Sequence, residues 1–261
     1  MRTSRVVMAA VPVLALAALI VGMTDRPVVA APPKKGVDAD ADKLLRQMSE
    51  YLSGLQSFSV QNFAVDETTM KSGEKIQATS DSEITVQRPN HMKSTQRGAG
   101  EGLSLYYDGK TMTLACKGNN SFESVAAPDN IDGAIDKMRK HFKVDAPGAD
   151  LLYQNPYDIL MEQVVSGRVI GKETVQGIPA THLAFKGEDV DFQIWIKDGN
   201  QPLPLRFVIT TKTVKANPQF TVQLSNWDTQ AKPSSFDFGF RAPAGAKPVT
   251  AVTSSCVAGT R

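Results

Sequence analysis

The chain has 261 residues, of which 41% are hydrophobic, and it carries 29 basic and 27 acidic residues. This length and composition suit one globular domain with a sizeable core. The balanced charge leaves no long basic block that could hold a phosphate backbone, so we expect no nucleic-acid partner.

The N-terminus has the features of a secretory signal. Arg2 and Arg5 precede an uncharged apolar run that is too short for a comfortable membrane span of about 20 residues. We predict a signal peptide over residues 1–31 that is cleaved near Ala30 or Ala31, with an uncleaved anchor as the alternative. Cleavage leaves 26 basic and 26 acidic residues, so we expect a formally neutral mature chain without a stable membrane span.

The first elements after the signal are one helix and a series of strands. Apolar residues recur at helical spacing behind Asp38 and Asp40, which predicts a helix that ends at Gly54. Period-two alternation then predicts strands, with a break at the Arg-Pro-Asn sequence 88–90 and a hairpin turn at Asp108-Gly109.

The middle of the chain returns to helical spacing and the second half returns to strands. Ile131, Ile135, Met138 and Phe142 predict an amphipathic helix, and Asn155-Pro156 begins a second helical piece. Strand patterns resume at Gly167 and end with a last short one, "FDFGF".

These patterns predict a mainly β protein of the α+β class. About eleven strands follow each other with short connections, which are too short for parallel crossovers, so the sheet should be antiparallel. A sheet of this length must curl. We therefore expect one curved sheet with an N-terminal helix, whose inserted helices cover the concave face.

Some strands carry large apolar side chains on both faces. Trp195 lies opposite Ile194 and Ile196, whereas an antiparallel sheet with one wet face should alternate apolar and polar residues. This pattern favours a sheet covered on both sides. The inner cover is either the helices alone or the helices together with a hydrophobic ligand, and the pattern leaves both open.

The sequence shows no pattern typical of catalysis or metal binding. His91, His141 and His182 form no ligand pair at helical spacing, and no Gly-x-Ser-x-Gly motif is present. We expect no metal, no cofactor and no enzymatic activity. The two cysteines, Cys116 and Cys256, either form a disulfide or remain one buried thiol and one thiol in the tail.

The order of the motifs resembles the LolA/LolB-type periplasmic lipoprotein carriers, and more closely an uncharacterised family of predicted periplasmic proteins with that architecture. The motifs are "LSGLQSFSVQNFAV", "VQRPNHMK", "LYYDGKTMTLA", "FQIWIKDGNQPLPLRFVIT" and "SSFDFGFRAPAGAKPV". The resemblance implies a periplasmic half-barrel over residues 32–250, with an acyl-chain cavity between sheet and helices, followed by a flexible tail over 251–261.

The resemblance also implies site residues and a function. It places on Arg88 the arginine that latches the helical lid to the sheet through backbone carbonyls. We expect a monomeric, non-enzymatic protein that carries or senses a lipid, acyl chain or lipoprotein. The alternative is a cell-envelope interaction module with a self-filled core and a protein partner. The expected ligand-binding side chains are Ile135, Met138 and Phe142 on the lid, and Phe192, Trp195 and Phe207 on the sheet.

Overall fold

The computed structural model describes residues 34–96, 102–144 and 146–252. The predicted signal peptide and the tail from residue 253 onward lie outside this part. None of the helices in the described ranges has the length and apolar character needed to span a bilayer.

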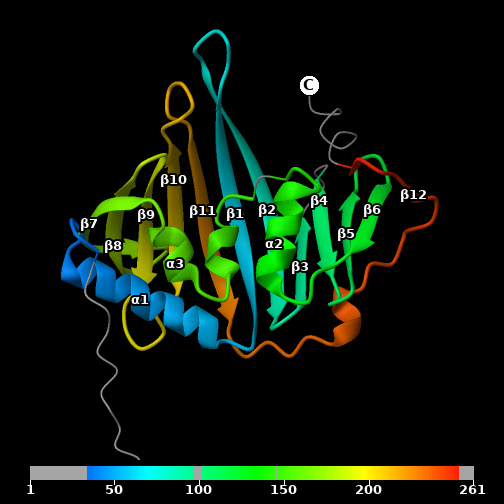
Figure 1. Cartoon of the computed structure of the whole chain (residues 1–261), viewed down its shortest axis with the longest axis horizontal. Coiled ribbons are helices and arrows are strands. Elements are labelled where there is room, and N and C mark those ends of the chain that lie inside the picture. Colours follow the sequence, from blue (N-terminus) through cyan, green and yellow to red (C-terminus); the bar gives the residue numbers. More distant parts are fainter. Residues whose placement is uncertain (1–33, 97–101, 145, 253–261) are drawn as a thin grey trace, which may run out of the picture. The chain divides into compact units, whose positions relative to one another are not determined.

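One sheet of twelve strands forms the framework of the domain (Figure 1). Its spatial order is β12-β6-β5-β4-β3-β2-β1-β11-β10-β9-β8-β7. The strands are β1 (Ser57–Thr69), β2 (Lys75–Gln87), β3 (His91–Gln96), β4 (Leu103–Tyr107), β5 (Thr111–Cys116), β6 (Ser121–Ala126), β7 (Val164–Val175), β8 (Ile178–Gly187), β9 (Val190–Lys197), β10 (Pro204–Thr211), β11 (Gln219–Asp228) and β12 (Lys247–Pro248).

Nearly all neighbouring strands pair antiparallel, as short connections require. The exception is the two-residue strand β12, which runs parallel to β6. The turn between β4 and β5 confirms the predicted hairpin, because Gly109 has φ of 86°, a conformation that glycine adopts at little cost. β1 joins the two halves of the sheet by pairing with β2 on one side and β11 on the other.

Short helices cover one face of this sheet (Figure 1). Asn130 caps α2, since its side chain accepts a hydrogen bond from the Gly133 backbone N–H at 2.8 Å. Asn155 caps α3, with Pro156 in the first turn as predicted. The helices on this face are α1 (Ala39–Gly54), α2 (Ile131–Lys140), η1 (Ala149–Leu152) and α3 (Pro156–Met161), whereas η2 (Ser235–Phe238) belongs to the C-terminal segment.

The predicted fold class is confirmed by this arrangement. The sheet has twelve strands instead of about eleven, and one predicted strand is wrong. The sequence "FDFGF" begins in the 3-10 helix η2, because Ser234 and Asp237 form a reciprocal capping box at its start.

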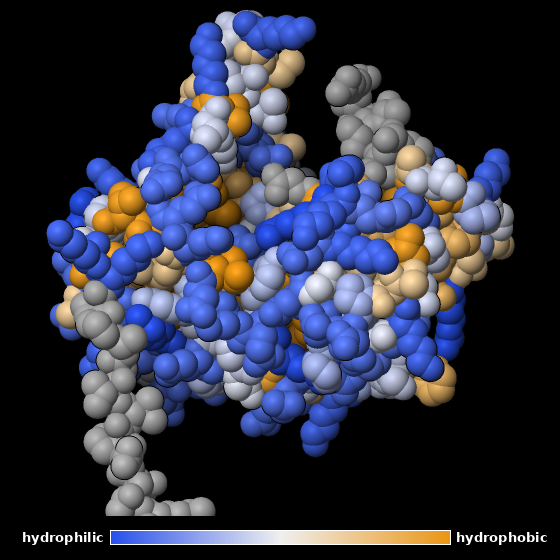
Figure 2. Space-filling model, viewed as in Figure 1, coloured by the Kyte–Doolittle hydropathy of each residue, from blue (hydrophilic) through white to orange (hydrophobic). Residues whose placement is uncertain are grey.

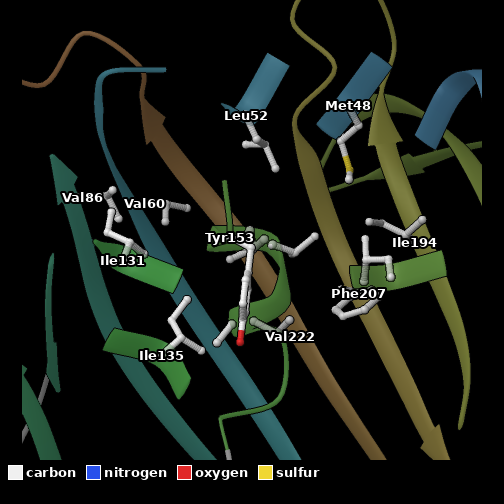
Figure 3. Packing of buried hydrophobic residues seen from close by; sticks show 14 of the residues in the cluster. Met48, Leu52, Val60, Val86, Ile131, Ile135, Tyr153, Ile194, Phe207 and Val222 are labelled. Carbon is white, nitrogen blue, oxygen red and sulfur yellow. The ribbon is translucent and has the colours of Figure 1, made fainter. Parts of the chain in front are cut away.

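The main core lies between the helices and the sheet. Figure 3 shows Ile131 and Ile135 of α2 beside Val60 and Val86 of the first strands, while Phe207 lies across the cluster. The helix-bearing surface is mostly hydrophilic, with separate apolar patches (Figure 2). The helices therefore turn their apolar sides to the sheet and their polar sides to solvent.

The C-terminal segment also packs against the sheet. Phe240 contacts the rings of Tyr106 and Phe122, with centroid distances of 5.2 and 4.9 Å. At the start of the predicted tail, Val252 is fully buried and its backbone N–H donates to a carboxylate oxygen of Glu123 at 3.2 Å. The packed domain therefore extends to residue 252.

Candidate functional site

A cavity of about 250 Å³ lies between the first half of the sheet and the helical cover. Strands β1 to β5 and β11 form one wall. The opposite wall consists of α2, residues 146–148 and η1, with Val144 beside them. Most of the lining side chains are apolar, among them Val60, Ile84, Leu105, Leu114, Ile135, Met138, Leu151 and Val222.

Small inner-face side chains explain why this space is not filled. Ala64 of β1 pairs with Ser80 of β2, and Ser94 of β3 pairs with Ile84 of β2. These three small side chains line the cavity together with Asn62. Ser80 is also solvent-exposed, so the cavity meets solvent at this end.

The cavity lining contains few polar side chains. Among the described lining residues, none is charged, and the polar ones besides Trp227 are Asn62, Ser80 and Ser94. The indole N–H of Trp227 donates to the Pro204 carbonyl at 3.1 Å. Asn62 differs, because its Oδ1 atom is buried and accepts no hydrogen bond from any of the described residues.

Arg88 connects the end of β2 to the helical cover. Its Nη2 donates to the carbonyl oxygens of Leu152 at 3.1 Å and Tyr153 at 3.4 Å. Burial lowers the pKa of the guanidinium, and the Asp132 carboxylate partly opposes this shift. Both hydrogen bonds come from one nitrogen of the guanidinium, and its role as a latch stays a prediction.

Polar contacts also join α2 to the segment that follows it. Arg139 forms an ion pair with Asp150 at 2.9 Å, and the Tyr153 hydroxyl donates to Asp136 at 2.8 Å. Burial and the Asp136 hydrogen bond raise the pKa of Tyr153 to about 12, so the hydroxyl keeps its proton at neutral pH. These contacts tie α2 and residues 149–154 into one unit.

The structure separates the residues that were predicted to bind ligand. Ile135 and Met138 line the cavity. Phe142, Phe192 and Phe207 are buried in the main core but are not among the cavity-lining residues.

Trp195 lies on the other face of the sheet, in a second apolar cluster with Ala180, Leu205 and Val208. It stacks on His182 with a centroid distance of 3.9 Å. Its indole N–H donates to Glu173 at 2.8 Å. These contacts explain its burial without a ligand, so Trp195 is not placed to line the cavity.

Sequence reasoning missed Asn62, Ala64, Ser80 and Ser94. The available signal was a run of small or polar residues in the inner phase of three consecutive strands, which also fits a solvent-facing surface. The two interpretations can be distinguished only when it is known which strands pair and which face of the sheet the helices cover.

The remaining predictions concern the two cysteines and the expected absence of a metal site. Cys116 is buried at the end of β5 and is not a free thiol. Cys256 lies outside the described residues, so its pairing with Cys116 stays a prediction. Within the described ranges, no group of three or more histidine, cysteine or acidic side chains is arranged to hold a metal ion.

Several solved structures are similar in fold to this chain. An uncharacterized conserved protein from Thermus thermophilus is 12% identical over 80% of this chain and 98% of its own, with a TM-score of 0.48. Lipoprotein LppX from Mycobacterium tuberculosis is 14% identical over 75% and 98%, with a TM-score of 0.45. The LolA superfamily protein NE2245 from Nitrosomonas europaea is 11% identical over 77% and 97%, with a TM-score of 0.40. Likenesses at this level carry no information about function.

Comparison by sequence assigns the family. No curated protein matches the chain. Residues 41–252 match a family model described as "Predicted periplasmic protein (DUF2092)". This match spans most of the chain and nearly all of the described domain, and it confirms the predicted resemblance to a family of predicted periplasmic proteins. The chain belongs to the DUF2092 family.

Proposed function

We propose that the protein binds the acyl chain of a lipid or lipoprotein in the cavity and acts as a non-enzymatic carrier or sensor in the periplasm. The observation that carries this proposal is an apolar cavity of about 250 Å³ between the sheet and a helical cover. Each 100 Å² of apolar ligand surface removed from water contributes about 2.5 kcal/mol. An acyl chain is the common biological group that offers such surface without charge.

The volume limits how much ligand fits. A dry cavity of roughly 150 Å³ lined by aliphatic and aromatic side chains binds one benzene molecule. The present cavity, at about 250 Å³, therefore suits a single chain segment instead of several chains. A longer chain would have to extend through the end near Ser80, where the cavity meets solvent.

Movement of the cover would open the cavity beyond its end near Ser80 and would ease the entry of a chain. The cover is held to the sheet by Arg88 and by the backbone N–H of Ile131, which donates to the Pro89 carbonyl at 3.0 Å. Both contacts arise from the turn between β2 and β3. We assign to Arg88 the role of a latch, since it joins this turn to the far end of the cover.

Ligand binding tests the proposal directly. Purified mature protein should carry lipid in native mass spectrometry, or bind the apolar dye N-phenyl-1-naphthylamine with one site after lipid removal. Ala64→Phe should abolish dye binding while the far-UV circular dichroism spectrum is kept, because the new ring fills the cavity.

Ala78→Phe provides the matched control. Ala78 lies on the same face of β2 as Ser80 but is exposed and does not line the cavity. This variant should bind dye as the unchanged protein does. The proposal is overturned if the unchanged protein neither carries lipid nor binds dye, or if Ala64→Phe binds as well as the control. An interaction module with a self-filled core would then be the better interpretation.

A further inference from the structure

Asn62 occupies a position inside the cavity where an apolar residue would be expected. It lies on the inner face of β1 between Val60 and Ala64, and all three residues line the cavity. Its cross-strand neighbours are Ser82 on β2 and Leu224 on β11. The amide therefore lies in the middle of the sheet wall instead of at its rim.

The Asn62 amide oxygen has no donor among the residues that the structure describes. Its Oδ1 atom is buried without a hydrogen-bond partner in this part of the chain. A buried acceptor that is left unpaired destabilises the fold, whereas an apolar side chain of similar shape carries no such cost. A hydrogen-bond donor on a bound ligand would remove this cost.

Two serine side chains lie close to Asn62 in the strand register. The pair Asn62–Ser82 lies between the pairs Ala64–Ser80 and Val60–Ile84, and Ser94 is the next residue across from Ile84. Ser80 and Ser94 line the cavity. A ligand hydroxyl that donates to Asn62 could therefore accept a hydrogen bond from a serine on a neighbouring strand.

The charge of the lining restricts the ligand further. None of the described lining residues is charged. A carboxylate or ammonium group drawn into the cavity would lose its water without gaining a counter-ion, which costs far more than one hydrogen bond returns. The described lining therefore favours a neutral group at Asn62.

We propose that the preferred ligand is an uncharged amphiphile whose hydroxyl or amide N–H donates to Asn62 inside the cavity, a proposal that rests on the function proposed above. The ligand class is a fatty alcohol, an acylated polyol or a fatty amide. Its polar group is bound by the sheet wall and is not left in solvent.

Displacement of N-phenyl-1-naphthylamine by four compounds of equal chain length tests this proposal. The affinity of octan-1-ol and of octanamide, each relative to octane, should be at least about 10-fold higher for the unchanged protein than for Asn62→Leu, because only the unchanged protein offers the Asn62 oxygen to the ligand's donor. Octanoate at pH 8 should bind at least about 10-fold more weakly than octan-1-ol, because its charge has no partner. The comparison of octanoate with octan-1-ol uses the unchanged protein, so it does not depend on a variant that folds.

Asn62→Leu should lower the affinity for octan-1-ol relative to octane and should fold at least as stably as the unchanged protein. Gln77→Leu is the matched control, since this exposed residue of β2 lies one position out of phase with the inner-face residues Ile76 and Ala78. The control should keep the affinity ratio of the unchanged protein. If the ratio of octan-1-ol to octane affinity is the same in the unchanged protein and in Asn62→Leu, or if octanoate binds as tightly as the alcohol, the inference fails while the cavity function stands. If none of the four displaces the dye, both fail.

Discussion

The two halves of the sheet share one architecture but have different interiors. In the second half, Phe185 stacks on Phe192 with a centroid distance of 4.7 Å, and Phe207 meets Phe192 edge-on at 5.6 Å. These rings fill the inner face of β8 to β10. In the first half, the inner face carries Asn62 and Ala64 on β1, Ser80 on β2 and Ser94 on β3, and these small side chains line the cavity.

The difference shows that side-chain size on the inner face decides where the domain is hollow. Helices cover both halves (Figure 1), so cover alone does not create or remove the space. A helix backbone is too wide to follow the sheet into a gap left by small residues. The cavity is thus encoded by a few small side chains on three strands.

The outer faces of the two halves are also covered in different ways. The second half covers its outer face with its own side chains, since Trp195 lies between His182 and the guanidinium of Arg206, which is 5.0 Å from the ring centroid. The first half uses the C-terminal segment, in which Phe238 contacts His91 at 5.1 Å. Apolar residues on both faces of a strand therefore have two separate causes in this domain.

The largest change in stability is expected from a matched pair of leucine truncations, one in each half of the sheet. Leu183 of β8 is fully buried in the second half of the sheet, which we call the filled half because aromatic rings fill its inner face. Leu105 of β4 is 4% exposed and lines the cavity. We expect Leu183→Ala to lower the free energy of unfolding by about 4 kcal/mol and Leu105→Ala by about 2 kcal/mol. A side chain beside an existing void has fewer packing contacts to lose.

Urea unfolding followed by circular dichroism measures both losses. Saturation with an apolar ligand should raise the free energy of unfolding of the unchanged protein. The increase should have a different size for Leu105→Ala, since only this truncation alters the cavity wall. Equal losses for the two variants would contradict the comparison and would mean that the first half is packed as tightly as the second.

The sequence predicted the fold well because local patterns determine it. Period-two alternation, the turn at Gly109 and the short connections were enough to predict an antiparallel sheet with inserted helices, and the structure agrees. The strand predicted at "FDFGF" was wrong because a short apolar run does not distinguish strand from helix. There, the capping box at Ser234 decides the outcome.

The site was predicted less well, because it depends on pairing between distant strands. Ile135 and Met138 were found, since a helical stripe identifies its buried side by itself. The sequence pattern of a strand identifies its two faces but does not show which face is covered. Trp195 faces outward because it pairs with Arg206 and His182, whereas Ile194 pairs with Phe207 and Leu183. Asn62 escaped notice because a small polar residue on a strand resembles a solvent-facing one.

A smaller effect on stability is expected from removing a contact that holds the helical cover over the cavity. Arg88→Met keeps the apolar stem but removes the donors to Leu152 and Tyr153. We expect a loss of about 1–3 kcal/mol in stability and a faster release of bound dye. Stopped-flow displacement measures the release rate, and hydrogen exchange should show weaker protection of amides in 149–154.

Arg168→Met is the control for this variant. Arg168 is an exposed arginine on β7, in the filled half, and its loss should leave dye release and the protection of the cover unchanged. A release rate for Arg88→Met equal to that of the control would remove the latch from the proposed function. The cavity itself would be unaffected by that result.

The smallest effect concerns the outer face of the filled half and depends on pH. Hydrogen bonds from Trp195 and from His182, at 2.8 Å each, hold the pKa of Glu173 below its usual value, and the charge of Arg206 acts in the same direction. A carboxylate with a lowered pKa in the folded state stabilises the fold above the unfolded pKa, and this contribution is lost as the pH falls through the folded one.

Glu173→Gln removes this titration, so the variant should be less stable than the unchanged protein at pH 7, and the difference should shrink as the pH falls toward 3. Urea midpoints at both values measure it, and the exposure of the carboxylate keeps the effect modest. A difference that is the same at both values would show that the carboxylate charge contributes nothing to the fold. Dye affinity should stay unchanged at pH 7, because the Glu173 network lies on the outer face of one half and the cavity on the inner face of the other.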